Sequence, residues 1–282
     1  MSEQSERNGP SGQERTSTSP PSASLAQPGG LMTDLGSVAR RALRLTVREP
    51  EAVLPALIIP LFFFVVNVGA LQMFVEASAP PGFSYKAFQL PLAIITAVTG
   101  VSRANSLVTD IQDGYFDRLL LTPIRRVSLL LGLMVADFVL VIALTIPVLA
   151  LGFILGVRFE TGLPGVLVFM LLAGFWGLVF TGFPYAIALR TGNPAAVNSS
   201  FLLFFPFVFL TTAFLPKEAL TGWLAAIATV NPVTYMLAAM RSLIQVGWDS
   251  TALGQAVAAI AVMGAVSMPL AFAALRGRLK RG

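Results

Sequence analysis

Six apolar segments alternate with shorter polar stretches along most of the chain. They run at about 52–74, 88–108, 128–156, 163–189, 195–215 and 252–275. Each is long enough to cross a hydrocarbon core as a helix, which takes roughly 20 residues. A backbone in lipid must satisfy its own hydrogen bonds, so a helix is the expected form of each segment. The pattern predicts an all-α, polytopic membrane protein whose six transmembrane helices lie in a domain at 51–276.

The stretch 216–248 has a different pattern from these six segments. It is only partly apolar, it is interrupted at Pro216 and Pro232, and it carries Trp223, an aromatic residue typical of membrane interfaces. Irregular backbone at membrane depth persists only where protein covers it or where it lines a cavity. We therefore expect a re-entrant helical hairpin on the outer side before the last span, rather than a seventh span.

The two ends of the chain are polar. Residues 1–30 are rich in Ser, Pro, Gln and Gly, which predicts a disordered cytoplasmic tail. In 31–50, apolar residues recur every three to four positions among Arg40, Arg41, Arg44 and Arg48, which predicts an amphipathic interfacial helix. The alternative is a basic segment that only sets the orientation in the membrane. Residues 277–282 are expected to form a basic cytoplasmic tail.

A charged island at 110–126 separates the second and third segments. It holds three acids and three arginines in a chain that is only 12% charged, so it must lie in water. From Tyr115 to Leu121 the residues favour a helix, and Pro123 would end it. We expect a short helix along the membrane surface through which a partner could apply force. In that helix Tyr115, Phe116 and Leu119 would project as an apolar knob, flanked by Asp113, Asp117 and Arg118.

The basic residues predict the orientation. With both termini in the cytoplasm, fifteen of the 19 lysines and arginines lie inside and four lie outside. Positive charge is typical of cytoplasmic loops, so an even number of spans is indicated in a multi-pass protein of the cell membrane. A seventh span would place the basic C-terminal residues outside.

The composition excludes several kinds of chemistry. The chain has no cysteine and no histidine, so it cannot use thiols or imidazoles. It contains no Gly-Lys pair and therefore no P-loop for a nucleotide. A net charge of +5 is low for a nucleic-acid-binding protein. We expect no enzyme activity, no cofactor, no metal and no nucleic-acid partner.

Two groups of residues within the apolar segments are candidate functional features. Arg103 and Asp137 lie on neighbouring antiparallel segments and are expected to form a buried ion pair that fixes helix packing; the alternative is part of a proton pathway. Phenylalanines crowd the first and fifth segments. Those that could line an apolar substrate path are Phe62, Phe201, Phe204 and Phe205. Packing against lipid explains them equally well.

The spacing of several residues resembles a known family. The island reads Asp110-x3-Gly114-x3-Arg118-x4-Pro123, and Arg126 and Asp137 follow. Later come Leu215-Pro216, Trp223, Asn231-Pro232 and Arg241. This layout is similar to that of the membrane subunits of type-2 ABC exporters, specifically the daunorubicin-resistance class of drug-export permeases.

The resemblance implies a function and partners. The island would be a coupling helix bound by a separate ATPase, present in two copies, through Asp110, Asp113, Gly114, Tyr115, Phe116, Asp117, Arg118, Leu119 and Pro123. A second permease, identical or homologous, would complete a central path beside membrane lipid, lined partly by the first, second and fifth spans. Many relatives carry a glutamate where this chain has Gln112. The cargo would be an amphipathic small molecule or a lipid; the alternatives are a glycan or glycolipid exporter, or a membrane scaffold that transports nothing.

Overall fold

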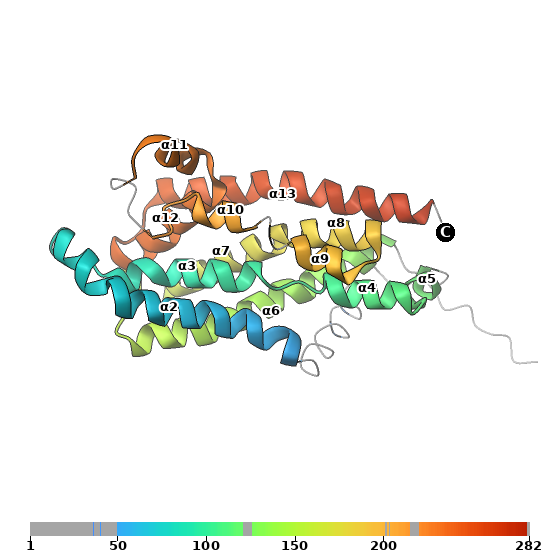
Figure 1. The fold of residues 1–282 in the computed structure, drawn as a ribbon, viewed down its shortest axis with the longest axis horizontal. Helices are drawn as coiled ribbons and strands as arrows, with labels where there is room; N and C mark the ends of the chain where they lie inside the picture. Colours follow the sequence, from blue (N-terminus) through green and yellow to red (C-terminus); the bar gives the residue numbers. More distant parts are fainter. Residues whose placement is uncertain are drawn as a thin grey trace, which may run out of the picture.

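The computed structural model describes residues 36, 40, 50–120, 126–200, 202, 204–214 and 220–280. This part of the chain forms helices and no strands, which confirms the all-α prediction. The long helices lie side by side along the long axis of the molecule (Figure 1). Their order is α2 (Pro50–Ser78), α3 (Tyr85–Thr99), α4 (Ala104–Gln112), α5 (Tyr115–Leu120), α6 (Arg126–Ile154), α7 (Gly162–Phe180), α8 (Gly182–Thr191), α9 (Pro194–Ser200), α10 (Phe204–Phe209), α11 (Gly222–Val230), α12 (Pro232–Gln245) and α13 (Ser250–Leu279).

Five stretches of the described chain are long and apolar enough to cross a membrane. They are Leu54–Ser78, Tyr85–Gln112, Val127–Ile154, Gly162–Thr191 and Ser250–Leu279. These match the first four predicted segments and the sixth. The pair α11 and α12 is bent by 80°, and counting it as one span would give six. A sharp bend of this kind agrees with the expected hairpin.

The predicted fifth segment is not one helix of full spanning length within the described residues. It forms a shorter apolar stretch, Pro194–Phe209, that contains α9 and α10. The carbonyl oxygens of Phe207 and Leu210 accept hydrogen bonds from the amide of Asn231, at 2.7 and 3.0 Å. Carbonyl groups at a helix end need such partners, so Asn231 replaces a further turn of α10.

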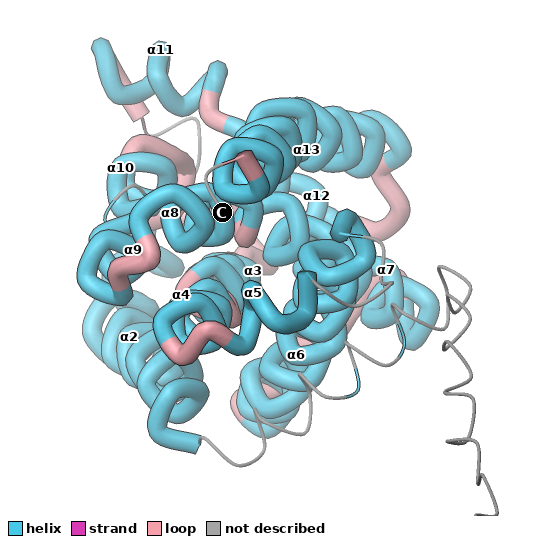
Figure 2. Tube along the Cα trace, turned by 90° about the vertical axis from the view of Figure 1, so that its right-hand side faces the viewer, coloured by secondary structure: helices cyan, strands magenta, loops and turns pink. Residues whose placement is uncertain are grey.

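Helix α3 lies at the centre of the described helices. Thirteen of its 15 residues are buried, and α2, α6, α7 and α12 pack around it (Figure 2). Helix α2 is far less buried. Its buried side chains over 54–78 are Pro60, Phe64 and Val68, spaced four residues apart and so on one face. The other side chains of α2 over this range are exposed or half-buried, so most of its surface is available to lipid or another chain.

Two of the spans are broken, and the break in the fourth lies just before Pro184, which has no N–H to bond the Phe180 carbonyl. The second span ends α3 at Thr99 and resumes as α4 at Ala104, and the fourth is divided between α7 and α8 at Thr181. At the break in the fourth span, a Cβ on Gly182 would lie 2.8 Å from the Cβ of Ser267 in α13. The Ser267 hydroxyl donates to the Val179 carbonyl. The backbone groups freed by this break are therefore held by a close neighbour.

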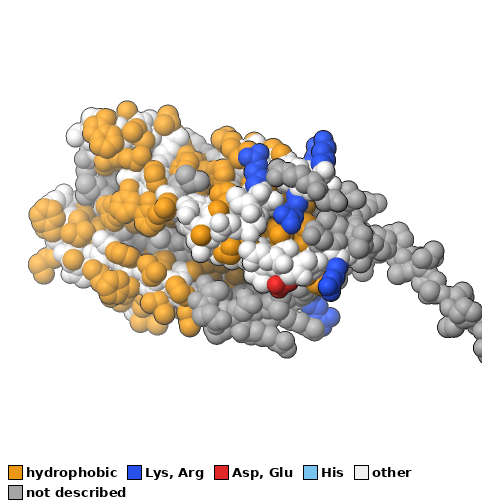
Figure 3. Space-filling view, turned by 45° about the vertical axis from the view of Figure 1, so that its right-hand side comes forward, with side chains coloured by type: hydrophobic (Ala, Val, Ile, Leu, Met, Phe, Trp, Pro, Cys, Tyr) orange, Lys and Arg blue, Asp and Glu red, His pale blue; other side chains and the backbone are white. Residues whose placement is uncertain are grey.

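Charge divides the two ends of the molecule. Figure 3 shows lysine and arginine side chains gathered at the end that carries α4, α5 and the C-terminal turns of α8 and α13, while hydrophobic side chains cover the opposite part. Exposed members of this basic group are Arg118, Arg190, Arg276 and Lys280. Helix α13 continues to Leu279, so the expected tail at 277–282 begins as helix. The tail at 1–30 and nearly all of the interfacial helix at 31–50 lie outside the described residues.

Candidate functional site

The charged end is built around the turn between α4 and α5. Asp110 lies in the last turn of α4, and Asp113 is the residue at which that helix ends. Gly114 follows with a φ of 68°, a left-handed conformation that glycine adopts without strain. Helix α5 then begins at Tyr115 and ends at Leu120. A short helix therefore occupies the predicted place, although Asp110 belongs to the preceding span.

The side chains of this turn divide into exposed and buried groups. Gln112, Asp113 and Arg118 are exposed, and Tyr115 is half-buried. Phe116 is only 4% exposed and belongs to a hydrophobic cluster with Ile111 and other residues of α4, α6, α8 and α13. Its expected projection as part of a knob is wrong. The reason is that apolar surface of the neighbouring helices lies within reach of the ring, and burial there removes it from water. The Arg278 guanidinium lies 5.9 Å from the centre of the Phe116 ring.

Several residues predicted to act at this end lie outside the part of the chain, or have side chains outside the part, that the structure describes. The side chains of Asp117, Leu119 and Arg126 and all of Pro123 belong to this group. Their roles remain predictions.

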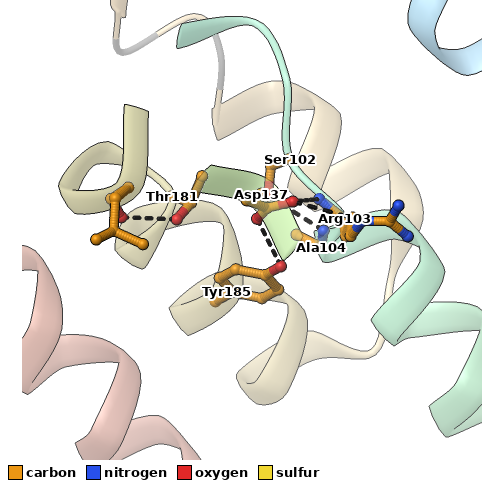
Figure 4. Close-up of polar contacts among 7 residues, drawn as sticks. Ser102, Arg103, Ala104, Asp137, Thr181 and Tyr185 are labelled. Carbon is orange, nitrogen blue, oxygen red and sulfur yellow. Dashed lines mark hydrogen bonds and ion pairs between the residues drawn. The ribbon is translucent and has the colours of Figure 1, made fainter. Parts of the chain in front are cut away.

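A polar cluster lies directly beneath the break between α3 and α4 (Figure 4). Asp137, on α6, is fully buried, and its Oδ1 lies 3.8 Å from Nε of Arg103. The same oxygen accepts a hydrogen bond from the Arg103 backbone N–H at 3.3 Å. Its Oδ2 accepts a hydrogen bond from the Tyr185 hydroxyl of α8 at 2.6 Å. The structure therefore brings the two expected residues together and adds Tyr185.

This geometry gives Asp137 two roles in helix packing. The carboxylate neutralises Arg103 and also receives a backbone N–H at the start of α4, where a negative charge is favourable. It thus joins α4, α6 and α8. The contribution of Tyr185 was missed because a tyrosine inside an apolar segment has no signal that distinguishes a buried hydroxyl from an interfacial one.

Two further hydrogen bonds fasten α4 at the exposed end. The Gln112 amide donates to the Gly192 carbonyl at 2.9 Å, and the Asn105 amide donates to Oδ1 of Asn198 at 2.8 Å. A carboxylate at position 112 could not donate to a carbonyl. Gln112 therefore makes a contact within the chain that a glutamate at this position could not make.

An apolar cavity of about 380 Å³ lies between α2, α3 and α10. Phe204 and Phe205, two of the residues expected along a substrate path, line this cavity together with Phe63 and Phe64. Phe62 does not line the cavity and is 61% exposed on α2. Phe201 lies outside the described residues.

The polar side chains that line this cavity are Asn67, Gln89 and Thr96. Each makes a hydrogen bond within its own helix, Gln89 to the Tyr85 hydroxyl. Gln89 was not selected from the sequence, although an amide within an apolar segment is a signal that could have identified it.

The hairpin at the opposite end is held by Asn231 and Arg241. Asn231 accepts a hydrogen bond from the Val233 N–H, and Pro232 begins α12, a favoured position for proline. Arg241 donates from α12 to the Phe88 carbonyl of α3. Trp223 on α11 is 69% exposed, and Pro216 lies outside the described residues.

Comparisons with known proteins agree with this architecture. The family model described as "ABC-2 type transporter" matches residues 33–244. The chain is 28% identical over 206 residues to the daunorubicin resistance ABC transporter permease protein DrrB1 of Streptomyces coeruleorubidus, and the match covers 72% of each chain. It is 27% identical over 202 residues to the probable doxorubicin resistance ABC transporter permease protein DrrC of Mycobacterium tuberculosis, covering 71% of this chain and 73% of the relative.

The matched region includes the broken second span, the α4–α5 turn, the polar cluster and most of the hairpin. It covers well over half of the chain, and the helices found in it are those of a multi-pass membrane protein. The chain therefore belongs to the ABC-2 type transporter family and is a homologue of drug-resistance permeases.

Proposed function

We propose that this chain is the membrane-spanning permease of an ABC exporter, and that a separate ATPase drives it. The observation that carries the proposal is the charged end. There the α4–α5 turn exposes polar side chains, and it follows directly on α4, the second part of a broken span. Two ATPase subunits would bind at this end in the cytoplasm. Two permeases, identical or homologous, would face each other in the cell membrane.

The contacts of α4 suggest how force would reach the membrane. A push on α5 would pass through Phe116 into the hydrophobic cluster shared by α4, α6 and α13. It would also pass from α4 through Asp137 to α6 and α8. Because both broken spans meet at this cluster, a movement of α4 would be shared by the second and fourth spans rather than absorbed in a loop.

The apolar cavity supports an amphipathic small molecule as the cargo. Its volume of about 380 Å³ lies in the range of small-molecule sites, and its lining combines aromatic rings with the amides of Asn67 and Gln89. The relatives are named for resistance to daunorubicin and doxorubicin, which also favours a drug-like cargo. We place the path for this cargo between α2, α3 and α10.

The second permease would cover the face of α2 that borders this cavity. Ile58, Ile59, Phe62 and Phe63 are all more than half exposed, and Ile59 and Phe63 also line the cavity. A partner helix against this face would close the path on its open side.

The decisive test is capture of an ABC ATPase encoded beside this chain. The full-length chain, purified from membranes, is expected to retain that ATPase, and Arg118→Glu in α5 is expected to reduce retention about tenfold or more, because a reversed charge in an interface opposes association. Arg158→Glu is the matched control, since it reverses an exposed arginine at the opposite end. Equal retention by wild type and Arg118→Glu would refute docking at α5.

Transport in reconstituted vesicles separates the remaining possibilities. ATP-dependent movement of daunorubicin would support a drug exporter. Movement of a glycolipid but not of daunorubicin would indicate a glycolipid exporter of the same fold. Absence of any ATPase partner would favour a membrane scaffold that transports nothing.

A further inference from the structure

A cavity of about 600 Å³ lies along the last turns of α13, the helix that ends at the charged end of the molecule (Figure 1). The described residues that line it all belong to this one helix. They are Pro269, Phe272, Ala273, Arg276, Gly277 and Lys280. Neither the cargo path nor the ATPase contact proposed above is built on these residues, so this α13 cavity needs an explanation of its own.

The lining of the α13 cavity changes from apolar to basic along the helix. Pro269 and Ala273 are exposed, and Phe272 is half-buried against the hydrophobic cluster of α4, α6, α8 and α13. Arg276 and Lys280 follow about one and two turns after Ala273, and both are exposed. Residues three and four positions apart lie on the same face of a helix, so the apolar and basic parts of the lining are continuous.

This change from apolar to basic falls where α13 would leave the membrane. The stretch Ser250–Leu279, which is long and apolar enough to span, ends among the basic residues. Arginine and lysine at such an end extend their long side chains toward the lipid headgroups. From Pro269 to Lys280 the helix rises roughly 16 Å, at 1.5 Å per residue. That length reaches from the hydrocarbon into the headgroup region.

Other basic residues of this end have different surroundings. Arg278, between Arg276 and Lys280 in the sequence, is half-buried, and its guanidinium lies 5.9 Å from the centre of the Phe116 ring. Arg190 is exposed in the last turn of α8 and does not line the α13 cavity. Basic residues are favourable in the last turn of any helix, because the carbonyl groups there carry partial negative charge. What distinguishes Arg276 and Lys280 is a cavity that joins their exposed charges to apolar side chains.

We propose that Arg276 and Lys280 bind the phosphate of an anionic phospholipid whose glyceryl group and upper acyl chains lie in the α13 cavity. The two side chains are four residues apart, so they are neighbours on the helix surface and both can reach one phosphate. Phe272 and Pro269 would contact the apolar part of the lipid. The volume lies in the range of small-molecule sites, and basic pockets beside spanning helices are typical of anionic lipid recognition. A soluble phosphate would leave the apolar half of the lining unused, which favours the lipid.

The test measures thermal unfolding of the full-length chain in a neutral detergent. Phosphatidylglycerol is expected to raise the unfolding midpoint in a saturable way, because a ligand that binds the folded state stabilises it. Phosphatidylcholine with the same acyl chains should raise the midpoint much less, since its headgroup carries no net charge. Inorganic phosphate at matched ionic strength should also raise it much less, because it has no apolar part.

Two kinds of variant separate charge from shape. Arg276→Gln and Lys280→Gln should each weaken the apparent affinity for phosphatidylglycerol about fivefold, which is the usual contribution of one basic residue beside anionic lipid. Arg190→Gln is the matched control, because it removes an exposed charge from the same end but outside the cavity lining. Ala273→Trp fills the cavity without changing any charge and should weaken the affinity at least fivefold. Its control is Ala265→Trp, at an exposed alanine of α13 that does not line the cavity.

Four outcomes would overturn the proposal. The first is no saturable shift with phosphatidylglycerol, or equal affinity in wild type and in Arg276→Gln combined with Lys280→Gln. The second is equal affinity in wild type and Ala273→Trp, which would mean that charge alone attracts the lipid. The third is an equal shift with inorganic phosphate. The fourth is a double variant that keeps its affinity for phosphatidylglycerol but no longer retains the ATPase, which would assign the cavity to that partner. All of these positions are exposed, so the variants leave the buried packing intact.

Discussion

Replacing Asp137 by leucine should destabilise the protein more than replacing Asp137 and Arg103 together. In the single variant, Arg103 remains 6% exposed at a site that has lost its carboxylate. Removing one member of a buried ion pair typically costs about 3–5 kcal/mol, because the remaining charge is left uncompensated. In Asp137→Leu with Arg103→Leu both charges of this pair are removed, so we expect an interaction energy of about 0.5–3 kcal/mol between the two changes.

Tyr185→Phe measures how much the third member of the polar cluster contributes to the free energy of unfolding. It removes only the hydroxyl that donates to Asp137 at 2.6 Å and keeps the buried ring. Loss of a hydrogen bond to a charged group costs about 1.5–3 kcal/mol. Thr145→Val is the control, on α6 with Asp137, since the Thr145 hydroxyl is buried but bonds to the Val141 carbonyl of α6 itself. We expect it to cost less than about 1.5 kcal/mol.

The assay is the free energy of unfolding in mixed micelles, measured by loss of helical circular dichroism as a denaturing detergent is added. If the costs of Asp137→Leu and Arg103→Leu are additive, the two side chains do not depend on each other and the reasoning fails. Tyr185→Phe at wild-type stability would remove the tyrosine from the cluster.

Three more predictions concern orientation, the α5 helix and helix contact. A cysteine at the exposed position Gln112 should be labelled only from the cytoplasm and one at Glu76 only from outside; external labelling at Gln112 would reverse the topology. Phe116→Ala should release α5, since deleting a buried phenylalanine typically costs about 3–5 kcal/mol, and amide hydrogen exchange of Tyr115–Leu120 should rise well above its wild-type rate. Gly182→Ala should lower the free energy of unfolding by about 1–3 kcal/mol, because the added Cβ meets α13. Gly254→Ala, whose Cβ meets open space, should not lower it. Equal unfolding midpoints for these two variants would contradict the close contact.

Length and hydropathy were sufficient to predict most of the fold. Segments such as 128–156 are long and continuously apolar, so lipid leaves them no alternative to helix. The break at Gly100–Arg103 could not be predicted, because a partner distant in the sequence holds it, whereas Pro184 is a signal in the sequence for the break at Thr181. Asp137 receives an N–H at the first break, and Ser267 donates to a carbonyl at the second. Hydropathy contains no information about such partners.

The candidate site was predictable to a similar extent. Charge and helix propensity indicated the short helix at Tyr115, and the antiparallel order of two segments indicated the pairing of Arg103 with Asp137. The burial of Phe116 was not predictable, because a six-residue amphipathic helix can turn its ring toward a partner or toward its own protein. Only the apolar surface of α4, α6 and α13 decides between them.

The polar cluster also orders events during synthesis of the chain. Arg103 precedes Asp137 by 34 residues, and Tyr185 follows it by 48. At about 5–20 residues per second, a ribosome needs roughly 2–10 s to reach Tyr185 after it has made Asp137. An aspartate alone near the centre of an inserted helix costs about 2.5–3.5 kcal/mol. The arginine that offsets this cost is already made when α6 emerges, so the second and third spans are suited to enter the bilayer together, and the tyrosine completes the cluster only when the fourth span arrives.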